Sequence, residues 1–472
     1  MKTPRILVKA APGLSSARLN FGATPVTFTV TPLFKSIAPL KALGATAANT
    51  WQILTPPPSF AEANAWDVCH SLLQQGFGVA GVPAPEFAEP DLEQQWITGN
   101  DPELGMALSR SCDGVNPQRQ EFPGAADNPY WFRDHGHSQF DDAIAQLGGP
   151  QVASKVRIAH FDTGYDPDHH TLPKHLRADI ARNFVDGGNP KDATDRTSGL
   201  LANLGHGTGT LCILAGTGQP GRSLLGGAPF AEVVPVRVAN RVVLFKNSAI
   251  AQAFDYVHSL NATGANRVDI ITMSMGGLAS QVWADAVNAV YEQGVFIVTA
   301  AGNNFGNLPT RNIVFPARFG RVVAACGVME DGRPYADLEI RLMAGNYGPE
   351  PKMKTAIAAP TPNVPWARWG CSDIVDFDGQ GTSAATPQVA AAAALWLQRN
   401  RAAVDAYPKG WTRVDAIRGA LFGSAKENAQ ESKRLGRGEL RAHEALAQAP
   451  AAASALQETA TDDALYVGKG AL

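Results

Sequence analysis

The chain has 472 residues, of which 45% are hydrophobic and 18% are charged, and its formal net charge is -3 at pH 7. This composition is typical of a globular protein with a large core, and the length allows two or three domains, or one large α/β domain with attachments. Because the net charge is small and no apolar run reaches 18 residues, nothing indicates a nucleic-acid partner or a membrane-spanning segment.

The cysteines are few and scattered, and they include no CxxC pair, so a zinc ribbon is excluded. They are Cys69, Cys112, Cys212, Cys326 and Cys371. A disulfide framework is unusual in a chain of this size, and we expect five reduced thiols. The N-terminal residues lack an apolar run long enough for a signal peptide. We therefore expect a cytoplasmic protein, with secretion by another route left open.

The strand-like and helical patterns of residues 1–100 predict a small separate α+β domain. A helix is expected over Phe60–Gln75, where Ala65, Val68, Leu72 and Leu73 share one side. Strand-like runs occur at Arg5–Lys9, Val26–Phe34, Trp51–Leu54 and Val79–Val82. Residues 101–127 are rich in glycine and proline without apolar periodicity, which indicates a linker.

From residue 128 to 448, short apolar runs alternate with amphipathic helices at Ala249–Leu260 and Ser280–Gln293. The runs are Val156–Phe161, Val233–Val238, Val268–Met273, Val295–Ala300 and Arg321–Gly327. Uninterrupted apolar strands suit a parallel sheet covered on both faces, so we expect a doubly wound, mostly parallel α/β domain. The Ala-rich residues 449–472 are expected to be a flexible tail, or a short helix docked on the surface.

Residues 157–170, RIAHFDTGYDPDHH, join an apolar strand to acids and histidines. Asp162 here fits four interpretations: half of an aspartic protease dyad, a metal ligand, the acid of a serine triad, or a residue of a structural turn. A dyad needs two such loops sharing one proton, and this chain has one. Adjacent side chains of one loop rarely converge on one ion, so a solvated loop is the simpler interpretation of the other candidate ligands. These are Asp166, Asp168, His169 and His170.

Three downstream motifs favour the triad interpretation. His206 stands at an expected helix start in GHGTGT, Asn303 follows a buried strand in AAGNN, and Ser383 precedes a long Ala-rich helix in GTSAATPQ. Each residue alone is better explained as a structural histidine, a turn residue or a helix N-cap. Together, in this order and in one α/β domain, they point to a catalytic set with Asp162.

These motifs resemble the subtilase family of serine peptidases over residues 128–448. The matching stretches are IAHFDTG at 158–164, GHGTGT at 205–210, ITMSMGG at 271–277, AAGNN at 300–304, FPA at 315–317 and GTSAATP at 381–387. The resemblance implies a serine endopeptidase in which Ser383 attacks, His206 is the base, Asp162 orients the histidine and Asn303 stabilises the oxyanion. One departure is Gln388, where the family usually has histidine.

The resemblance also implies that extended polypeptide substrates bind along two segments. Their residues are Ser274, Met275, Gly276, Gly277, Ala300, Ala301 and Gly302. It implies no cofactor and no catalytic metal, and a structural calcium ion cannot be read from the sequence.

Residues 1–97 end in PEFAEPDLEQQW, which is similar to the end of subtilase pro-regions. We therefore expect the N-terminal domain to act as an intramolecular inhibitor whose end, near Pro85–Trp96, runs towards the cleft. Cleavage between about 97 and 127 would release it. The alternative is a catalytically silent subtilase-fold interaction scaffold.

Overall fold

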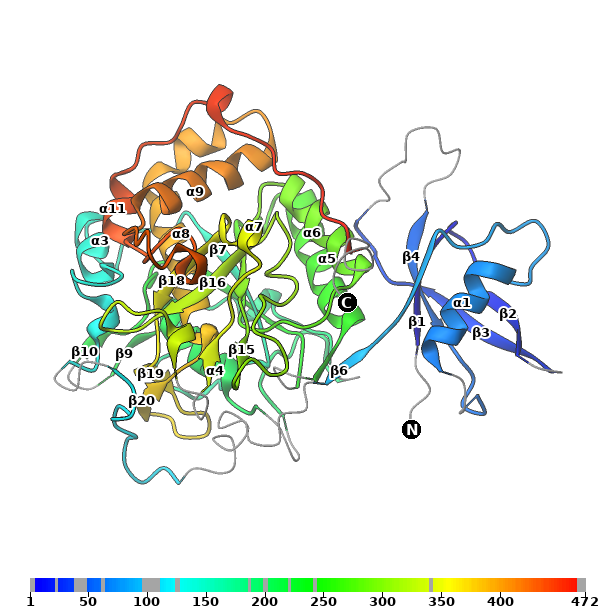
Figure 1. Ribbon diagram of the computed structural model, residues 1–472, viewed down its shortest axis with the longest axis horizontal. Coiled ribbons are helices and arrows are strands. Elements are labelled where there is room, and N and C mark those ends of the chain that lie inside the picture. The colour runs from blue at the N-terminus through cyan, green and yellow to red at the C-terminus, as the bar shows by residue number, and fades with distance from the viewer. Residues whose placement is uncertain are drawn as a thin grey trace.

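The computed structural model describes residues 5–21, 24–37, 49–60, 64–95, 111–123, 128–185, 188–197, 203–219, 222–240, 244–338 and 343–464. They form a small N-terminal unit beside a large unit, and β6 reaches from the first towards the second (Figure 1). None of the helices among these residues has the length and apolarity to cross a membrane.

The N-terminal unit is an antiparallel five-stranded sheet, in the order β2-β3-β4-β1-β5, with one helix packed on it. The strands are β1 Ile6–Ala10, β2 Ser16–Phe21, β3 Thr24–Pro32, β4 Thr50–Thr55 and β5 Phe87–Pro90. The helix α1, Ala65–Gln75, begins later than expected because the Asn64 side chain caps it by accepting from the Trp66 N–H. The expected strand at Val79–Val82 is wrong, since these residues form turns, and β2 was not expected.

The large unit contains a seven-stranded parallel sheet in the order β18-β16-β14-β13-β7-β11-β8. Its strands are β7 Arg157–Asp162, β8 Arg182–Asn183, β11 Glu232–Arg237, β13 Ile270–Met273, β14 Phe296–Ala300, β16 Val323–Val328 and β18 Ala356–Pro360. The five expected strands are confirmed to within two residues at each end. The edge strands β8 and β18 were not expected.

Helices cover both faces of this sheet, as the apolar strands require. Along β7, Ile158 packs into the cluster that includes α8, while Phe161 packs into the cluster that includes α5 and α6. The helices are α3 Phe140–Gln146, α4 His206–Ala215, α5 Asn247–Thr263, α6 Gln281–Glu292, α7 Glu350–Met353, α8 Thr382–Asp405, α9 Gly410–Ser424, α10 Ser432–Leu435 and α11 Ala442–Ala447. The short strands outside the two sheets are β6 Glu93–Gln95, β9 Thr217–Gln219, β10 Arg222–Leu224, β12 Leu244–Lys246, β15 Asn303–Asn304, β17 Ala344–Gly345, β19 Val364–Ala367 and β20 Val375–Gly379.

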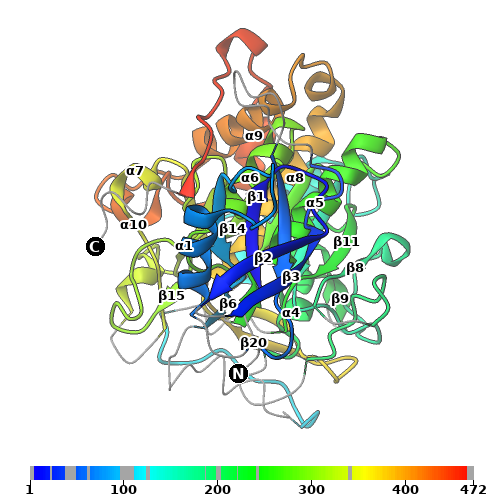
Figure 2. The ribbon, with the colours of Figure 1, turned by 90° about the vertical axis from the view of Figure 1, so that its right-hand side faces the viewer.

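The N-terminal unit docks on α5 and α6, and its sheet lies against the large unit in the view of Figure 2. Asp91 accepts from the Ser248 N–H at the start of α5, at 2.9 Å. Glu89 accepts from the Gln281 N–H at the start of α6, at 2.9 Å. In return, Asp255 on α5 accepts from the backbone N–H groups of residues 35–37. β6 pairs antiparallel with β12, immediately before α5.

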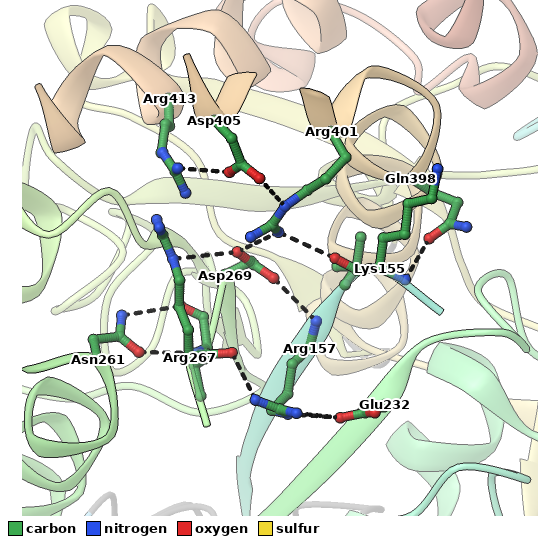
Figure 3. A network of polar contacts seen from close by, with 12 residues as sticks. Lys155, Arg157, Glu232, Asn261, Arg267, Asp269, Gln398, Arg401, Asp405 and Arg413 are labelled. Atoms are coloured by element: carbon green, nitrogen blue, oxygen red, sulfur yellow. Dashed lines mark hydrogen bonds and ion pairs between the residues drawn. The ribbon is translucent and has the colours of Figure 1, made fainter. Parts of the chain in front are cut away.

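A polar network ties the amino end of the large sheet to the C-terminal helices (Figure 3). Buried Asp269 accepts from the Arg157 N–H at 3.1 Å and from Arg401 on α8 at 2.7 Å, and it pairs with Arg267 at 3.6 Å. Arg401 also donates to Asp405, at 2.8 Å. One carboxylate therefore binds a backbone N–H of the sheet, a cation from the loop before β13 and a cation from a helix.

A disulfide joins Cys112 to Cys371, so the expectation of five reduced thiols is wrong. Cys112 lies in the expected linker, whose described residues 111–123 are bound along the large unit. The Asn116 N–H donates to Asp376 at 2.8 Å, and the Arg119 N–H donates to Asn363 at 2.9 Å. This segment is therefore part of the large unit.

Residues 449–464 of the expected flexible tail are docked in a largely extended form. Asp462 accepts from the backbone N–H groups of Gly320 and Arg321, at 2.6 and 2.9 Å, and its backbone oxygen accepts from Asn288. These bonds hold the tail beside α6.

We predict that Asp269→Asn lowers the free energy of unfolding by about 1–3 kcal/mol, because it removes the carboxylate that pairs with Arg267 and one of the two that pair with Arg401. Urea unfolding measures this difference. The matched control is Asp179→Asn, whose exposed ion pair with Arg177 is worth less than about 0.5–1 kcal/mol. Equal losses in both variants would contradict the role given to Asp269.

We predict that three of the five cysteines react with a thiol reagent when the protein is unfolded without reductant. In the folded protein the reaction should be slow, because burial raises the pKa of Cys69, Cys212 and Cys326 to about 12. Non-reducing peptide mapping should recover the peptides of Cys112 and Cys371 linked together. Five reactive thiols would contradict the disulfide.

Candidate active site

The best-defined polar pair of the large unit joins the end of β7 to the start of α4. Asp162 is the last residue of β7, and His206 is the first residue of α4. The His206 Nδ1 lies 2.7 Å from the Asp162 Oδ1, and both side chains are buried. The geometry is that of a carboxylate that fixes the orientation of an imidazole ring.

A buried clamp holds the two segments that carry this pair. Asp195 accepts from the Thr163 hydroxyl and from the Gly205 N–H, both at 2.8 Å, so it binds the residue after Asp162 and the residue before His206. Gly207 is also required, since a Cβ there would lie 1.9 Å from the Gly164 carbonyl oxygen. α4 can approach the β7 loop this closely only with glycine at that position.

Asp162 is ionised although it is fully buried. Burial alone would raise its pKa, but the charge of His206 and its hydrogen bond, the nearby His160, and the Thr163 N–H at 2.8 Å together hold the pKa below its usual value. The structure therefore keeps a negative charge beside the His206 ring, where it can stabilise an imidazolium ion.

Ser383 lies at the start of α8, which contacts α4. Its hydroxyl donates to the Ser274 carbonyl at 3.1 Å, and the Ser274 hydroxyl donates to the Ser383 carbonyl at 2.9 Å. Ser274 directly follows β13, the neighbour of β7 in the sheet. Ser383 is thus placed at the same carboxyl edge of the sheet as Asp162, where ligands of parallel α/β sheets bind.

Asn303 is held by the residue that precedes Ser383. Its Oδ1 accepts from the Thr382 N–H at 2.9 Å, while the Thr382 hydroxyl contacts the Gly302 backbone at 3.1 Å. Because the amide oxygen is occupied in this way, the Asn303 NH₂ group is directed away from the Thr382 N–H. The structure therefore links the AAGNN and GTSAATP motifs directly.

The expected substrate-binding segments follow β13 and β14, two adjacent strands. Gly277 exchanges two backbone hydrogen bonds with Phe315, at 2.7 and 2.9 Å, and a Cβ on Gly276 would meet Val314 at 2.5 Å. The side chain of Ala301 is fully buried in a core cluster, and its backbone N–H and carbonyl are hydrogen-bonded to Ala325 and Val314, each at 3.0 Å. Substrate binding by the residues of 274–277 and 300–302 stays a prediction.

The polar residues after Asp162 serve separate structural contacts. Asp166 accepts from the Gly370 N–H at 2.7 Å, and the His169 Nε2 contacts the Ile374 carbonyl at 3.0 Å. Across the part of the chain that the structure describes, no three His, Cys, Asp or Glu side chains are grouped as metal ligands would be.

Several residues around the site carried no signal that sequence reasoning could use. Asp195 lies in a loop without a motif, and Trp366 on β19 places its ring 5.5 Å from the His206 ring. Thr382 lies inside a quoted motif but was given no role. The unusual Gln388 is buried and donates to the Pro360 carbonyl at 2.7 Å, while it accepts from Ser138 at 3.1 Å.

Comparison with known proteins identifies the family. The subtilase family pattern matches residues 153–438, which is more than half of the chain. The chain therefore belongs to the subtilase family.

Named relatives agree with this assignment. The chain is 30% identical over 255 residues to the minor extracellular protease Epr of Bacillus subtilis (strain 168), covering 53% of this chain and 33% of that protein. It is 27% identical over 199 residues to the major intracellular serine protease of the same organism, covering 40% and 58%. It is 29% identical over 250 residues to subtilisin DY of Bacillus licheniformis, covering 52% and 78%. The chain thus spans less than two thirds of the first two relatives.

Proposed function

We propose that the protein is a subtilisin-like serine endopeptidase with Asp162, His206 and Ser383 as its catalytic triad. The observation that carries the proposal is the buried 2.7 Å contact between Asp162 and His206. The placement of Ser383 and Asn303 at the same sheet edge supports it. Extended polypeptides are the proposed substrates, in keeping with the family.

In this mechanism the protein's own side chains move the protons. Asp162 binds the Nδ1–H of His206, which leaves the Nε2 as the basic nitrogen that takes the hydroxyl proton of Ser383. The serine oxygen attacks the peptide carbonyl carbon, and the imidazolium then gives its proton to the leaving amine. The buried negative charge of Asp162 stabilises the imidazolium between these two transfers.

The oxyanion would be stabilised by two donors that are fixed before the substrate arrives. One is the Asn303 NH₂ group, whose direction is set by the hydrogen bond from the Thr382 N–H to its Oδ1. The other is the Ser383 N–H at the start of α8, where the positive end of the helix dipole adds to it.

We also propose that the N-terminal unit is an intramolecular inhibitor. Its last described strand, β6, adds antiparallel to β12, which is how an extended peptide binds to a strand edge. Residues 111–123 are bound to the large unit and joined to it by the disulfide. The cleavage that separates the two units would therefore fall between residues 95 and 111, a narrower interval than the sequence alone predicts.

The disulfide favours an oxidising compartment, because structural disulfides persist there and are rare in the cytosol. The names of the relatives include both extracellular and intracellular proteases, so they do not decide the compartment. The expected cytoplasmic location loses the support that five reduced thiols would have given it.

We predict that Ser383→Ala abolishes hydrolysis of an unstructured protein substrate. The expected loss in kcat is about 10⁶-fold, a magnitude known from subtilisin itself. The wild-type chain should be labelled by a fluorophosphonate probe at Ser383, and mass spectrometry should find its N-terminus between residues 95 and 111. The Ser383→Ala chain should stay uncut and unlabelled.

The alternative function, a catalytically silent scaffold, makes the opposite prediction. The wild-type chain would then be neither labelled nor cut, and Ser383→Ala would behave identically. Active wild-type protein with an uncut chain would instead contradict only the inhibitory role of the N-terminal unit.

We predict that docking of the N-terminal unit weakens as the pH rises from 5.5 to 8. Burial raises the pKa of Glu89 to about 7, although hydrogen bonds from Ser280, Gln281 and Val282 oppose this. A raised pKa means that the docked form holds a proton that the undocked form has lost above about pH 4.3. The contribution of Glu89 to the docking free energy is therefore largest below that pH, decreases as the pH rises towards 7, and changes little at higher pH.

The rate at which self-cleaved protein releases its N-terminal fragment measures this effect, and native mass spectrometry can record that rate at each pH. Glu89→Gln removes the titration and so separates it from that of His258, which also lies at the interface. The ratio of wild-type to Glu89→Gln release rates should rise with pH by about tenfold or more. The matched control Glu86→Gln, which removes an exposed ion pair with Lys9 and keeps an acceptor for Asn49, should follow the wild type. A constant ratio would contradict the role of Glu89.

A further inference from the structure

A second chain of hydrogen bonds reaches Asp162 through its other carboxylate oxygen. Oδ1 accepts from His206 and from the Thr163 N–H, whereas Oδ2 accepts from the Thr210 hydroxyl on α4 at 3.0 Å. The same hydroxyl lies 2.8 Å from the Nε2 of His160 on β7. His160 is itself 3.7 Å from Oδ2, too far for a direct hydrogen bond.

His160 occupies a position where an apolar side chain would be expected. Side chains alternate along a strand, so His160 shares its face of β7 with Ile158 and Asp162, and Ile158 is part of the hydrophobic core. His160 is 3% exposed and Thr210 is fully buried. Burying an imidazole among apolar residues costs free energy unless it is hydrogen-bonded. The hydrogen bond between His160 and Thr210 therefore offsets the free-energy cost of burying this imidazole.

Proton counting fixes the direction of each hydrogen bond. The Thr210 hydroxyl has one hydrogen, and it could donate to Asp162, to His160 or, at 3.3 Å, to the carbonyls of His206 and Gly207. The carboxylate is the strongest acceptor of the four because it is charged. When the hydroxyl donates to Asp162, the contact with His160 requires the Nε2 of His160 to carry a hydrogen and donate it.

The surroundings keep His160 in this neutral form. Burial lowers the pKa of the His160 imidazole to about 4, and the charge of Asp162 offsets only part of that effect. The other charged or titratable groups next to the Asp162 loop are His206, Arg237, which donates to the Thr163 carbonyl at 3.0 Å, and Asp195. A neutral ring with hydrogen on Nε2 is the form that suits the Thr210 oxygen.

We propose that His160 is a positioning residue for the catalytic aspartate and that it acts through Thr210. By donating to the Thr210 oxygen, it directs the hydroxyl hydrogen to Asp162 Oδ2 and away from the α4 carbonyls. The carboxylate is then fixed at both oxygens, with Oδ1 directed to His206. The donor at Oδ2 also spreads the negative charge, so that His206 stays unprotonated to lower pH. This inference rests on the proposed triad.

pH–rate profiles of kcat/KM on a peptide substrate test this role. Thr210→Val and His160→Leu should each lower the plateau by about tenfold and move the half-maximal pH up by about half a unit. His160→Gln can still place an N–H near the Thr210 oxygen, and it should stay within about twofold of the wild type. The matched control is Thr272→Val on β13, beside His160 in register. Its buried hydroxyl has no partner among the described residues, and no change is expected.

A second measurement separates this inference from the proposed function. In a Ser383→Ala chain with ¹⁵N-labelled histidines, NMR should show His160 with hydrogen on Nε2 alone at pH 7, assigned by its loss in His160→Gln. Hydrogen on Nδ1 alone, or on both nitrogens, would overturn the proposal whether or not the enzyme is active. So would His160→Leu and Thr210→Val profiles that match Thr272→Val, because the pair would then serve packing only. Lack of Ser383-dependent hydrolysis in the wild type would instead refute the triad.

Discussion

A carboxylate that is fully shielded from water must be surrounded by donors, and Asp162 imposes this requirement at the centre of the molecule. It stands at the end of β7, between β13 and β11 in the parallel sheet. His206, Thr163 and Thr210 each supply a hydrogen bond to it. Two of these donors lie on α4, so the position of that helix is tied to one charge. To donate to Asp162, α4 must lie close to the loop after β7, and Gly207 permits this because it has no Cβ.

The docking of the N-terminal unit repeats this principle at the surface. Glu89 binds the first residues of α6, and Asp91 binds those of α5. At the start of a helix the backbone N–H groups have no partner within the helix, and the helix dipole is positive. Two residues two positions apart in sequence thus recognise two neighbouring helices. Trp51 and Leu7 bury apolar surface against the α5 and α6 cluster. The two carboxylates fix where the N-terminal unit sits along these helices.

The features that could be read from the sequence are those with short-range signals. The five central strands are apolar on both faces, so they stand out, and the residues of the proposed triad lie in glycine-rich motifs. β18, AIAAP, was missed because alanines and a terminal proline carry little strand signal. α1 was extended too far because Phe60 continues the apolar period, although the cap at Asn64 sets the start. The Asp195 clamp and the Thr210 contact depend on residues brought together by the fold alone.

The disulfide has a topological consequence. Cys112 and Cys371 are 259 positions apart, and the covalent loop between them contains Asp162, His206 and Asn303 but not Ser383. A single backbone break anywhere within the loop would leave both pieces in one covalent molecule, with every proposed catalytic group retained. The proposed activity could cleave the protein's own chain. After such a cut within the loop, the disulfide would keep the two pieces joined. In reducing conditions this tolerance is lost, and a cut between Asp162 and Cys371 divides the proposed active site between two chains.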